Sequence, residues 1–212
     1  MTRIKICGIT NLVDAIGAVE AGADLLGFNF YPPSPRAISP LECAKITAVV
    51  RGQFPEVSLV GVFVNMPVEQ MKAIMESCSL TYAQLHGDET PEILAEMQGR
   101  AYKAFRGIPR PEIINQFLRQ APPAPPAFLM DAAVQGLYGG SGITADWLAA
   151  ANLAREYPML LAGGLNPENV GAAITQVQPW GVDTASGVEF GPGRKDANKI
   201  TAFVKAVRGA TH

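Results

Sequence analysis

Short runs of apolar and β-branched residues alternate along this chain with stretches whose apolar positions recur at helical spacing. This alternation is typical of a parallel sheet whose strands are joined by crossover helices. The expected strands are 3–7, 24–30, 58–64, 82–85, 102–105, 127–131, 159–162 and 181–184. The expected helices begin near Asn11, Pro40, Pro67, Thr90, Arg110, Thr144, Pro167 and Asp196. Proline is well tolerated in a first helical turn, and asparagine at positions 11 and 166 is a plausible N-cap.

Eight strand–helix units predict a closed barrel rather than an open doubly wound sheet. The fold class is therefore α/β, a single (β/α)8 TIM barrel spanning residues 1–212 as one domain. The proline-rich segment 121–127 resembles a linker in composition. Because the strand–helix alternation continues on both sides of it, we interpret it as a stiff loop at the non-catalytic end of the barrel.

Composition narrows the classes of partner. Hydrophobic residues make up 48% of the chain and charged residues 17%, which is enough apolar material for a large core. A formal net charge of −2 gives no sign of a surface for nucleic acid or for an anionic membrane. There is no apolar run long enough to span a bilayer, and the strand pattern starts at once, without a signal peptide. Three widely spaced cysteines predict a reducing cytoplasm and neither a disulfide framework nor a metal site. We expect a monomer.

Two glycine-containing segments near the C-terminus, 161–169 and 181–196, each follow a short apolar run. Glycine lets backbone N–H groups approach an anion closely, and the start of a helix adds unpaired donors. A barrel of this type binds phosphate after its seventh and eighth strands, which is where these segments fall. The pair therefore predicts a phosphate site, although one such turn alone would more often be an ordinary left-handed turn.

Two reactive side chains stand at predicted strand ends, where barrels of this kind carry their chemistry. Cys7 ends the first strand beside Gly8; the alternative is a small buried hydrophobic residue. Asp131 ends the sixth strand, and the alternative is a cap for the following loop. A thiolate base and a carboxylic acid form a suitable pair for moving protons within a bound sugar phosphate.

Side-chain alternation along the first strand places Lys5 on the same face as Cys7. If Cys7 faces the barrel mouth, Lys5 lies inside the barrel, where an unpaired ammonium is costly. Strand eight closes against strand one, so Asp183 is a candidate partner. Our hypothesis is that Lys5 and Asp183 form a buried pair and that Lys5 favours a Cys7 thiolate.

Two further polar residues follow predicted strands. Arg36 lies in a proline-rich loop after the second strand, and its planar guanidinium suits a carboxylate, although a solvated arginine is the usual alternative. His86 ends the fourth strand. It is a candidate acid or base, although a hydrogen-bonded structural histidine is the more common case.

Together the motifs closely resemble the phosphoribosylanthranilate isomerase family: KICGIT (5–10), GFNF (27–30), SPR (34–36), GVFVN (61–65), QLHGDE (84–89), GGSG (139–142), AGGLNPENV (162–170), SGVE (186–189), PG (192–193) and KD (195–196). The resemblance implies a TIM barrel of the ribulose-phosphate-binding type and an Amadori rearrangement in tryptophan biosynthesis without metal or organic cofactor. It implies Asp131 as general acid at the ribose ring oxygen and Cys7 as general base at C2. Arg36 would hold the anthranilate end. The phosphate would lie against Gly163, Gly164, Ser186 and Gly187, with Gly140 and Ser141 closing the mouth.

The sequence departs from the family pattern at Ile143, where relatives often carry lysine, and at Ala145, where an aromatic residue is common. One alternative is a sister barrel acting on another sugar phosphate, such as a histidine-pathway isomerase or indole-glycerol-phosphate synthase. The first would be expected to use two aspartates, and the second a lysine and a glutamate. The other alternative is a non-catalytic sugar-phosphate-binding barrel, which would not need both Cys7 and Asp131.

Overall fold

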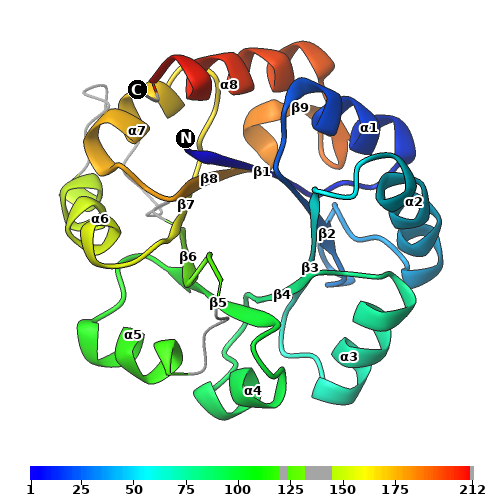
Figure 1. The fold of residues 1–212 in the computed structure, drawn as a ribbon, viewed down its shortest axis with the longest axis horizontal. Coiled ribbons are helices and arrows are strands. Elements are labelled where there is room, and N and C mark those ends of the chain that lie inside the picture. Colours follow the sequence, from blue (N-terminus) through cyan, green and yellow to red (C-terminus); the bar gives the residue numbers. More distant parts are fainter. Residues whose placement is uncertain (120–123, 132–144, 211–212) are drawn as a thin grey trace.

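The chain forms a closed parallel barrel of eight strands surrounded by helices, as Figure 1 shows for a computed structural model that describes residues 1–119, 124–131 and 145–210. The strands are β1 (Arg3–Cys7), β2 (Leu25–Asn29), β3 (Ser58–Phe63), β4 (Tyr82–Leu85), β5 (Ala101–Arg106), β6 (Phe128–Asp131), β7 (Leu160–Ala162) and β8 (Gly181–Thr184). The helices are α1 (Leu12–Ala21), α2 (Pro40–Gln53), α3 (Val68–Ser77), α4 (Pro91–Glu96), α5 (Pro111–Leu118), α6 (Ala145–Glu156), α7 (Val170–Val177) and α8 (Ala197–Ala210). The predicted (β/α)8 fold is confirmed, because β1 pairs with β8 and closes the sheet.

Local capping explains where the helices begin. The side chain of Asn11 accepts a hydrogen bond from the backbone of Asp14, so the predicted cap of α1 is confirmed. The prediction for α7 is wrong by three residues, since this helix begins at Val170 and not near Pro167. The Asn166 side chain instead accepts from the backbone amides of Glu168 and Asn169, which holds residues 166–169 in a turn.

A short antiparallel hairpin follows β8 and was not predicted. After the 3-10 helix η1 (Ser186–Val188), strands β9 (Glu189–Gly191) and β10 (Arg194–Lys195) pair with each other outside the barrel. Gly193 makes the turn with a φ of 73°, a left-handed conformation that favours glycine. The hairpin contacts the start of the chain, because the Thr10 hydroxyl donates to the carbonyl of Gly193 at 2.6 Å.

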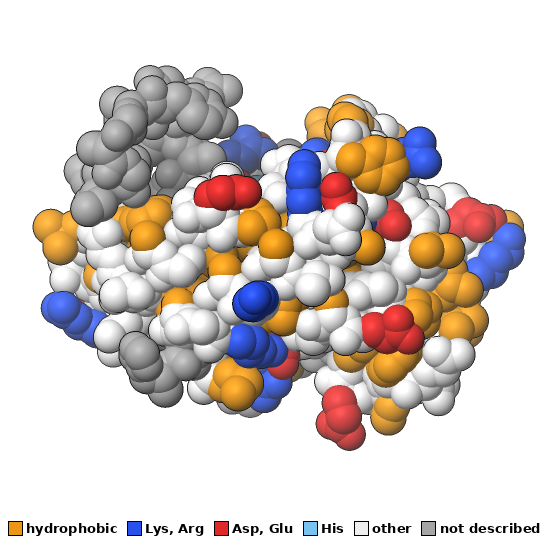
Figure 2. Space-filling view, turned by 90° about the horizontal axis from the view of Figure 1, so that it is seen from above, with side chains coloured by type: hydrophobic (Ala, Val, Ile, Leu, Met, Phe, Trp, Pro, Cys, Tyr) orange, Lys and Arg blue, Asp and Glu red, His pale blue; other side chains and the backbone are white. Residues whose placement is uncertain are grey.

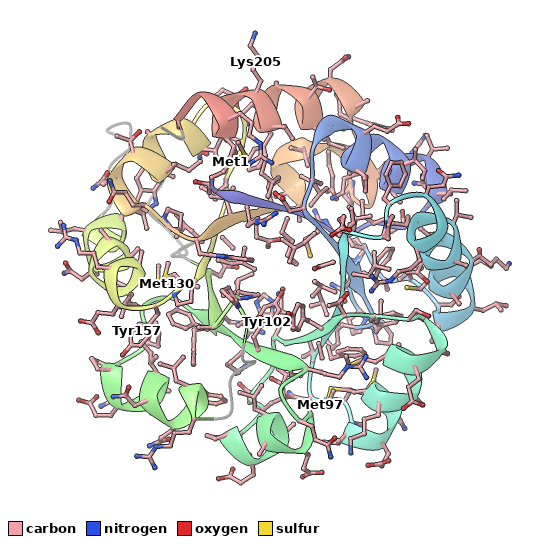
Figure 3. The ribbon with its side chains drawn as sticks, in the orientation of Figure 1. Met1, Met97, Tyr102, Met130, Tyr157 and Lys205 are labelled. Atoms are coloured by element: carbon pink, nitrogen blue, oxygen red, sulfur yellow. The ribbon has the colours of Figure 1, made fainter. Side chains whose placement is uncertain are left out.

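The apolar residues form two cores. The larger core lies between the strands and the helices, and a smaller one fills the inside of the barrel around Leu25, Val60, Tyr102 and Leu129. In Figure 3, Tyr102 points inward from β5, whereas Lys205 points outward from α8. Alternate residues of each strand therefore face the two cores, as the strand period requires.

The outer surface carries mixed charge. On the face seen in Figure 2, lysine, arginine, aspartate and glutamate side chains are interspersed, and no broad area of one sign covers that face. Among the described residues there is no helix with the length and apolar character needed to cross a membrane.

The last helix is joined to the N-terminal end of the barrel through Arg208. Its guanidinium donates to the carbonyls of Thr2 at 2.7 Å and Gly22 at 3.1 Å, and it pairs with Asp24 at 3.3 Å. These bonds connect α8 to the residues before β1 and β2. Arg208 thus completes the ring of helices, in which α8 lies between α7 and α1 (Figure 1).

We expect Arg208→Met to lower the free energy of unfolding by about 1–3 kcal/mol, because the carbonyls of Thr2 and Gly22 lose this donor and Asp24 loses one of its two cations. Urea unfolding followed by circular dichroism measures this change. The matched control is Lys205→Met on the same helix, whose exposed side chain points into solvent (Figure 3), with an expected change within about 0.5 kcal/mol. Equal unfolding midpoints for the two variants would contradict the role assigned to Arg208.

Candidate active site

A polar cavity of about 230 Å³ opens at the C-terminal ends of the strands. It contains most of the residues that the sequence singled out: Cys7, Arg36, His86, Asp131, Gly163, Gly164, Asp183 and Ser186 line its wall. Lys5 lies beneath them inside the barrel, and Gly187 follows Ser186 in η1. Gly140, Ser141 and Ile143 lie outside the described residues.

The predicted pair between Lys5 and Asp183 forms inside the barrel. The Lys5 ammonium is fully buried and donates to the Asp183 carboxylate at 2.8 Å, across the register that joins β1 to β8. Asp183 raises the pKa of Lys5 far above its ordinary value, although burial alone lowers it. Lys5 is therefore charged, and its partner compensates for its removal from water.

The Cys7 thiol experiences opposing effects. Burial is the largest of them and raises the pKa of the thiol, and the nearby Asp183 acts in the same direction. Lys5 and Lys195 lower this pKa, but burial outweighs them and the net shift is upward. Lys5 thus favours the thiolate, as expected. The predicted direction of the Lys5 effect agrees with the structure, and burial of the thiol opposes it.

Asp131 is placed by the edge of β6. Its backbone carbonyl accepts from the amide of Gly107 at 2.8 Å, and its register partner on β5 is Arg106. The half-buried side chain lines the cavity. Because β6 and β1 lie on different sides of the barrel (Figure 1), the carboxyl of Asp131 and the thiol of Cys7 reach the same cavity from opposite walls.

The glycines after β7 and β8 form the remaining wall. Gly163 and Gly164 have φ values of 106° and 67°, and within the described part of the chain their backbone amides donate to no protein acceptor. Gly187 is needed for another reason, because a Cβ there would collide with the carbonyl oxygen of Leu165. That same oxygen accepts from the Thr184 hydroxyl at 2.6 Å, which joins the two glycine loops.

Arg36 is not a solvated loop arginine. Its guanidinium forms a two-pronged ion pair with Glu189 of the hairpin, with Nε–Oε1 at 2.9 Å and Nη2–Oε2 at 2.7 Å. Among the described residues, its Nη1 has no partner and remains available to a ligand. From the sequence, Glu189 and Lys195 have no assigned role. The signal that could have indicated them is that both are charged residues in a short glycine-rich stretch, 189–195. This stretch has no helical or strand period.

His86 takes part in a hydrogen-bonded chain that starts inside the barrel. The Tyr102 hydroxyl donates to Gln84 Oε1 at 3.0 Å, and Gln84 Nε2 lies 3.2 Å from His86 Nδ1. This chain assigns Nδ1 as the acceptor and leaves the ring proton on Nε2. Burial lowers the pKa of His86, so the ring is neutral at pH 7. It is therefore suited to donating a hydrogen bond within the cavity.

Fold and cavity together define the class: a (β/α)8 barrel whose polar residues converge at the C-terminal ends of its strands, where enzymes of this fold carry their active sites. Residues 4–206 match the family model described as N-(5'-phosphoribosyl)anthranilate (PRA) isomerase. The chain belongs to this family of isomerases.

Relatives that carry this name match the chain over nearly its full length. The N-(5'-phosphoribosyl)anthranilate isomerase of Magnetococcus marinus is 45% identical over 209 residues, which cover 98% of this chain and 96% of that protein. The crystal structure of the Thermotoga maritima phosphoribosyl anthranilate isomerase is 41% identical, with a TM-score of 0.84 over 99% of this chain and 100% of that chain. A further isomerase structure, in complex with reduced 1-(O-carboxyphenylamino)-1-deoxyribulose 5-phosphate, is 38% identical, with a TM-score of 0.81 over 99% of this chain and 100% of that chain.

Replacing Lys5 by methionine is expected to raise the pKa of the Cys7 thiol further, because the charge that opposes burial is lost while Asp183 stays. The pH dependence of Cys7 alkylation by iodoacetamide, followed by mass spectrometry, measures this pKa. We also expect a loss of about 3–5 kcal/mol in the free energy of unfolding, since Asp183 is left without its partner. Lys45→Met, at an exposed pair with Glu42, is the control. An unchanged alkylation profile for Lys5→Met would refute the coupling.

Gly187→Ala is expected to raise the KM for a phosphorylated substrate at least about tenfold, because the new methyl group must push the start of η1 away from Leu165, and lost charge-assisted bonds cost roughly 1.5 kcal/mol or more. Steady-state kinetics with the family's substrate measures the effect. Gly52→Ala in α2 is the control, since a Cβ there meets nothing within 4 Å. The assignment is wrong if both variants keep the wild-type KM.

Proposed function

We propose that this chain converts N-(5'-phosphoribosyl)anthranilate into 1-(2-carboxyphenylamino)-1-deoxyribulose 5-phosphate, an Amadori rearrangement of tryptophan biosynthesis. Membership of the isomerase family supports this activity. The observation that carries the assignment of residues is the cavity itself, which brings Cys7 and Asp131 together with the amides of two glycine loops.

In the first step, Asp131 acts as the general acid. Its carboxyl group donates a proton to the ribose ring oxygen while the bond between C1 and that oxygen breaks. The lone pair of the anthranilate nitrogen forms the C1–N double bond, which gives an open-chain iminium ion. A carboxyl at the edge of β6 suits this step, because the cavity admits the sugar and the backbone bond from Gly107 fixes the strand end.

In the second step, Cys7 acts as the general base and removes the proton from C2. The released electron pair forms the C1–C2 double bond and neutralises the iminium nitrogen, giving an enolamine. This enolamine becomes the ketone when the C2 hydroxyl loses its proton and C1 gains one, so the product is an isomer of the substrate. The step requires the Cys7 thiolate, and the ammonium of Lys5 is the feature that stabilises this thiolate against the opposing effect of burial.

The two anionic ends of the substrate would lie against different walls. Nη1 of Arg36 would bind the anthranilate carboxylate, while the other side of the guanidinium is paired with Glu189. The backbone amides of Gly163, Gly164, Ser186 and Gly187 would bind the phosphate. His86 would donate a hydrogen bond from Nε2, and Asp183 keeps Lys5 in place. Gly140 and Ser141, proposed to close the mouth, lie outside the described residues.

We also propose that the protein acts in the cytoplasm as a monomer on this small phosphorylated substrate. Sedimentation velocity tests the quaternary state, and a single species of about twice the chain mass would reject the monomer. The non-catalytic and differently specific alternatives are disfavoured because Cys7 and Asp131 both line the cavity. Turnover of freshly prepared phosphoribosylanthranilate by the purified protein is the direct test of the activity.

Cys7→Ala and Asp131→Asn are each expected to lower kcat by about 10²–10⁴-fold, since each removes one proton-transfer group while the binding walls remain. Product formation followed by fluorescence measures kcat, and equilibrium binding of the reduced product analogue shows that the site is intact. Cys78→Ala, a buried thiol outside the cavity, is the control and should keep kcat. A variant at position 7 or 131 with wild-type kcat would remove that residue from the mechanism.

A further inference from the structure

We propose that Glu189 and Lys195 are positioning residues, which hold the backbone of Cys7 and the guanidinium of Arg36 in one buried charged network. Neither side chain lines the cavity. The inference rests on the proposed roles of Cys7 and Arg36, and it adds two residues that act through them. The hairpin β9–β10 carries both new residues and is the element that the strand–helix alternation does not predict.

All three N–H donors of the Lys195 ammonium bond to acceptors beside the end of β1, which carries Cys7. Its side chain is 1% exposed and donates to the backbone carbonyl of Cys7, to that of Ala185 at 3.1 Å and to Glu189 at 2.8 Å. An ammonium has three protons, so none remains for another acceptor. Cys7 ends β1 and Ala185 follows β8, which means that Lys195 joins the two strands that close the barrel.

Glu189 connects this lysine to Arg36. Its carboxylate is 4% exposed and accepts from Lys195 as well as from two nitrogens of Arg36. These partners hold the pKa of Glu189 below its ordinary value against the opposing effect of burial, so the group is ionised. Since two cations share one carboxylate, the network keeps a net positive charge. That charge faces the site where the thiolate and the substrate carboxylate are proposed to lie.

The hairpin is itself fixed from both sides. The backbone amide of Lys195 donates to Asp14 of α1 at 2.9 Å, and the ammonium of Lys199 in α8 donates to the carbonyl of Glu189 at 2.8 Å. The bond from Thr10 to Gly193 adds a third connection. The network therefore has a rigid support, which is what a positioning function requires.

An equivalent arrangement elsewhere in the barrel supplies a matched control. Lys103 of β5 donates to the carbonyls of Leu85 and Gly87 at 3.0 and 2.7 Å, and to Glu89 at 3.0 Å. It is a buried lysine with two carbonyls and one glutamate, like Lys195, but these partners include neither Cys7 nor Arg36. A purely structural role for Lys195 would give its removal the same consequences as removal of Lys103.

The charge environment of Cys7 gives the expected direction of the effect. The groups that act on the thiol are Lys5 and Asp183 inside the barrel, Lys195 from the hairpin, Arg36 from the loop after β2 and Tyr102 from β5. Lys195 lowers the pKa of the thiol. Its loss should therefore raise that pKa, while the loss of Glu189 should act first on Arg36.

The experiment compares Lys195→Met, Glu189→Gln and Lys103→Met in the full-length protein. For Lys195→Met we expect the midpoint of Cys7 alkylation by iodoacetamide to rise by about 0.5–1 pH unit. We expect kcat to fall about tenfold or more, as the base shifts with its backbone. For Glu189→Gln we expect the larger change in KM, a rise of about tenfold, because Arg36 loses its orienting carboxylate. Lys103→Met should lower the unfolding midpoint but keep the alkylation midpoint.

The inference is overturned if Lys195→Met leaves the alkylation midpoint where it is, as Lys103→Met should, and loses activity only in proportion to its loss of folded protein. Should Lys195→Met fail to fold, Glu189→Gln together with Lys195→Arg decides. A wild-type KM in Glu189→Gln rejects the network. An alkylation midpoint in Lys195→Arg that is displaced as far as in Lys5→Met also rejects it. Failure of this inference can be distinguished from failure of the proposed function. The alkylation midpoint is measured without substrate and tests the network alone, whereas a fully active Cys7→Ala would show that Cys7 is not the base.

Discussion

The ion pair between Lys5 and Asp183 is the interaction on which the site depends. It lies inside the barrel across β1 and β8, the two strands that close the sheet. Two hydrophobic residues would fill that space at lower cost in desolvation. The pair is explained by what stands two residues further along β1, because Cys7 lies on the same face and the ammonium stabilises its ionised form. Part of the barrel interior is thus occupied by an ion pair that acts on the ionisation of one thiol.

The strands and this pair could be predicted because both follow from a period of two. Apolar runs such as 58–63 have few alternatives to a buried strand, and alternation along β1 placed Lys5 inside the barrel, where it required a carboxylate. Helix starts were less certain where a side chain competes with the helix. The Asn166 side chain bonds two backbone amides and holds a turn, and this delayed α7 to Val170.

The rest of the site could not be predicted from the sequence, because it depends on contacts between distant segments. Nothing in the loop around Arg36 indicates that Glu189, from the other end of the chain, takes two of its nitrogens. The hairpin that carries Glu189 has three-residue and two-residue strands, too short for a recognisable period. The sequence indicated that Lys5 favours the Cys7 thiolate, but not the net direction of the pKa shift, because burial is a property of the folded barrel and outweighs both lysines.

The arrangement of charge explains how a chain with a net charge of −2 can attract an anionic substrate. Lys5, Lys195 and Arg36 surround the Cys7 side of the cavity, whereas Asp183 and Glu189 are the only carboxylates that pair with them among the described residues. Three cations against these two carboxylates leave an excess of positive charge on the Cys7 side of the cavity, whereas Asp131 lies on another wall. Because Lys5 and Lys195 are buried, their charges act more strongly than charges at the surface. A thiolate forming at Cys7, or a carboxylate arriving beside Arg36, would meet this excess. The carboxylates are thus present in the number that keeps the cations oriented without neutralising them.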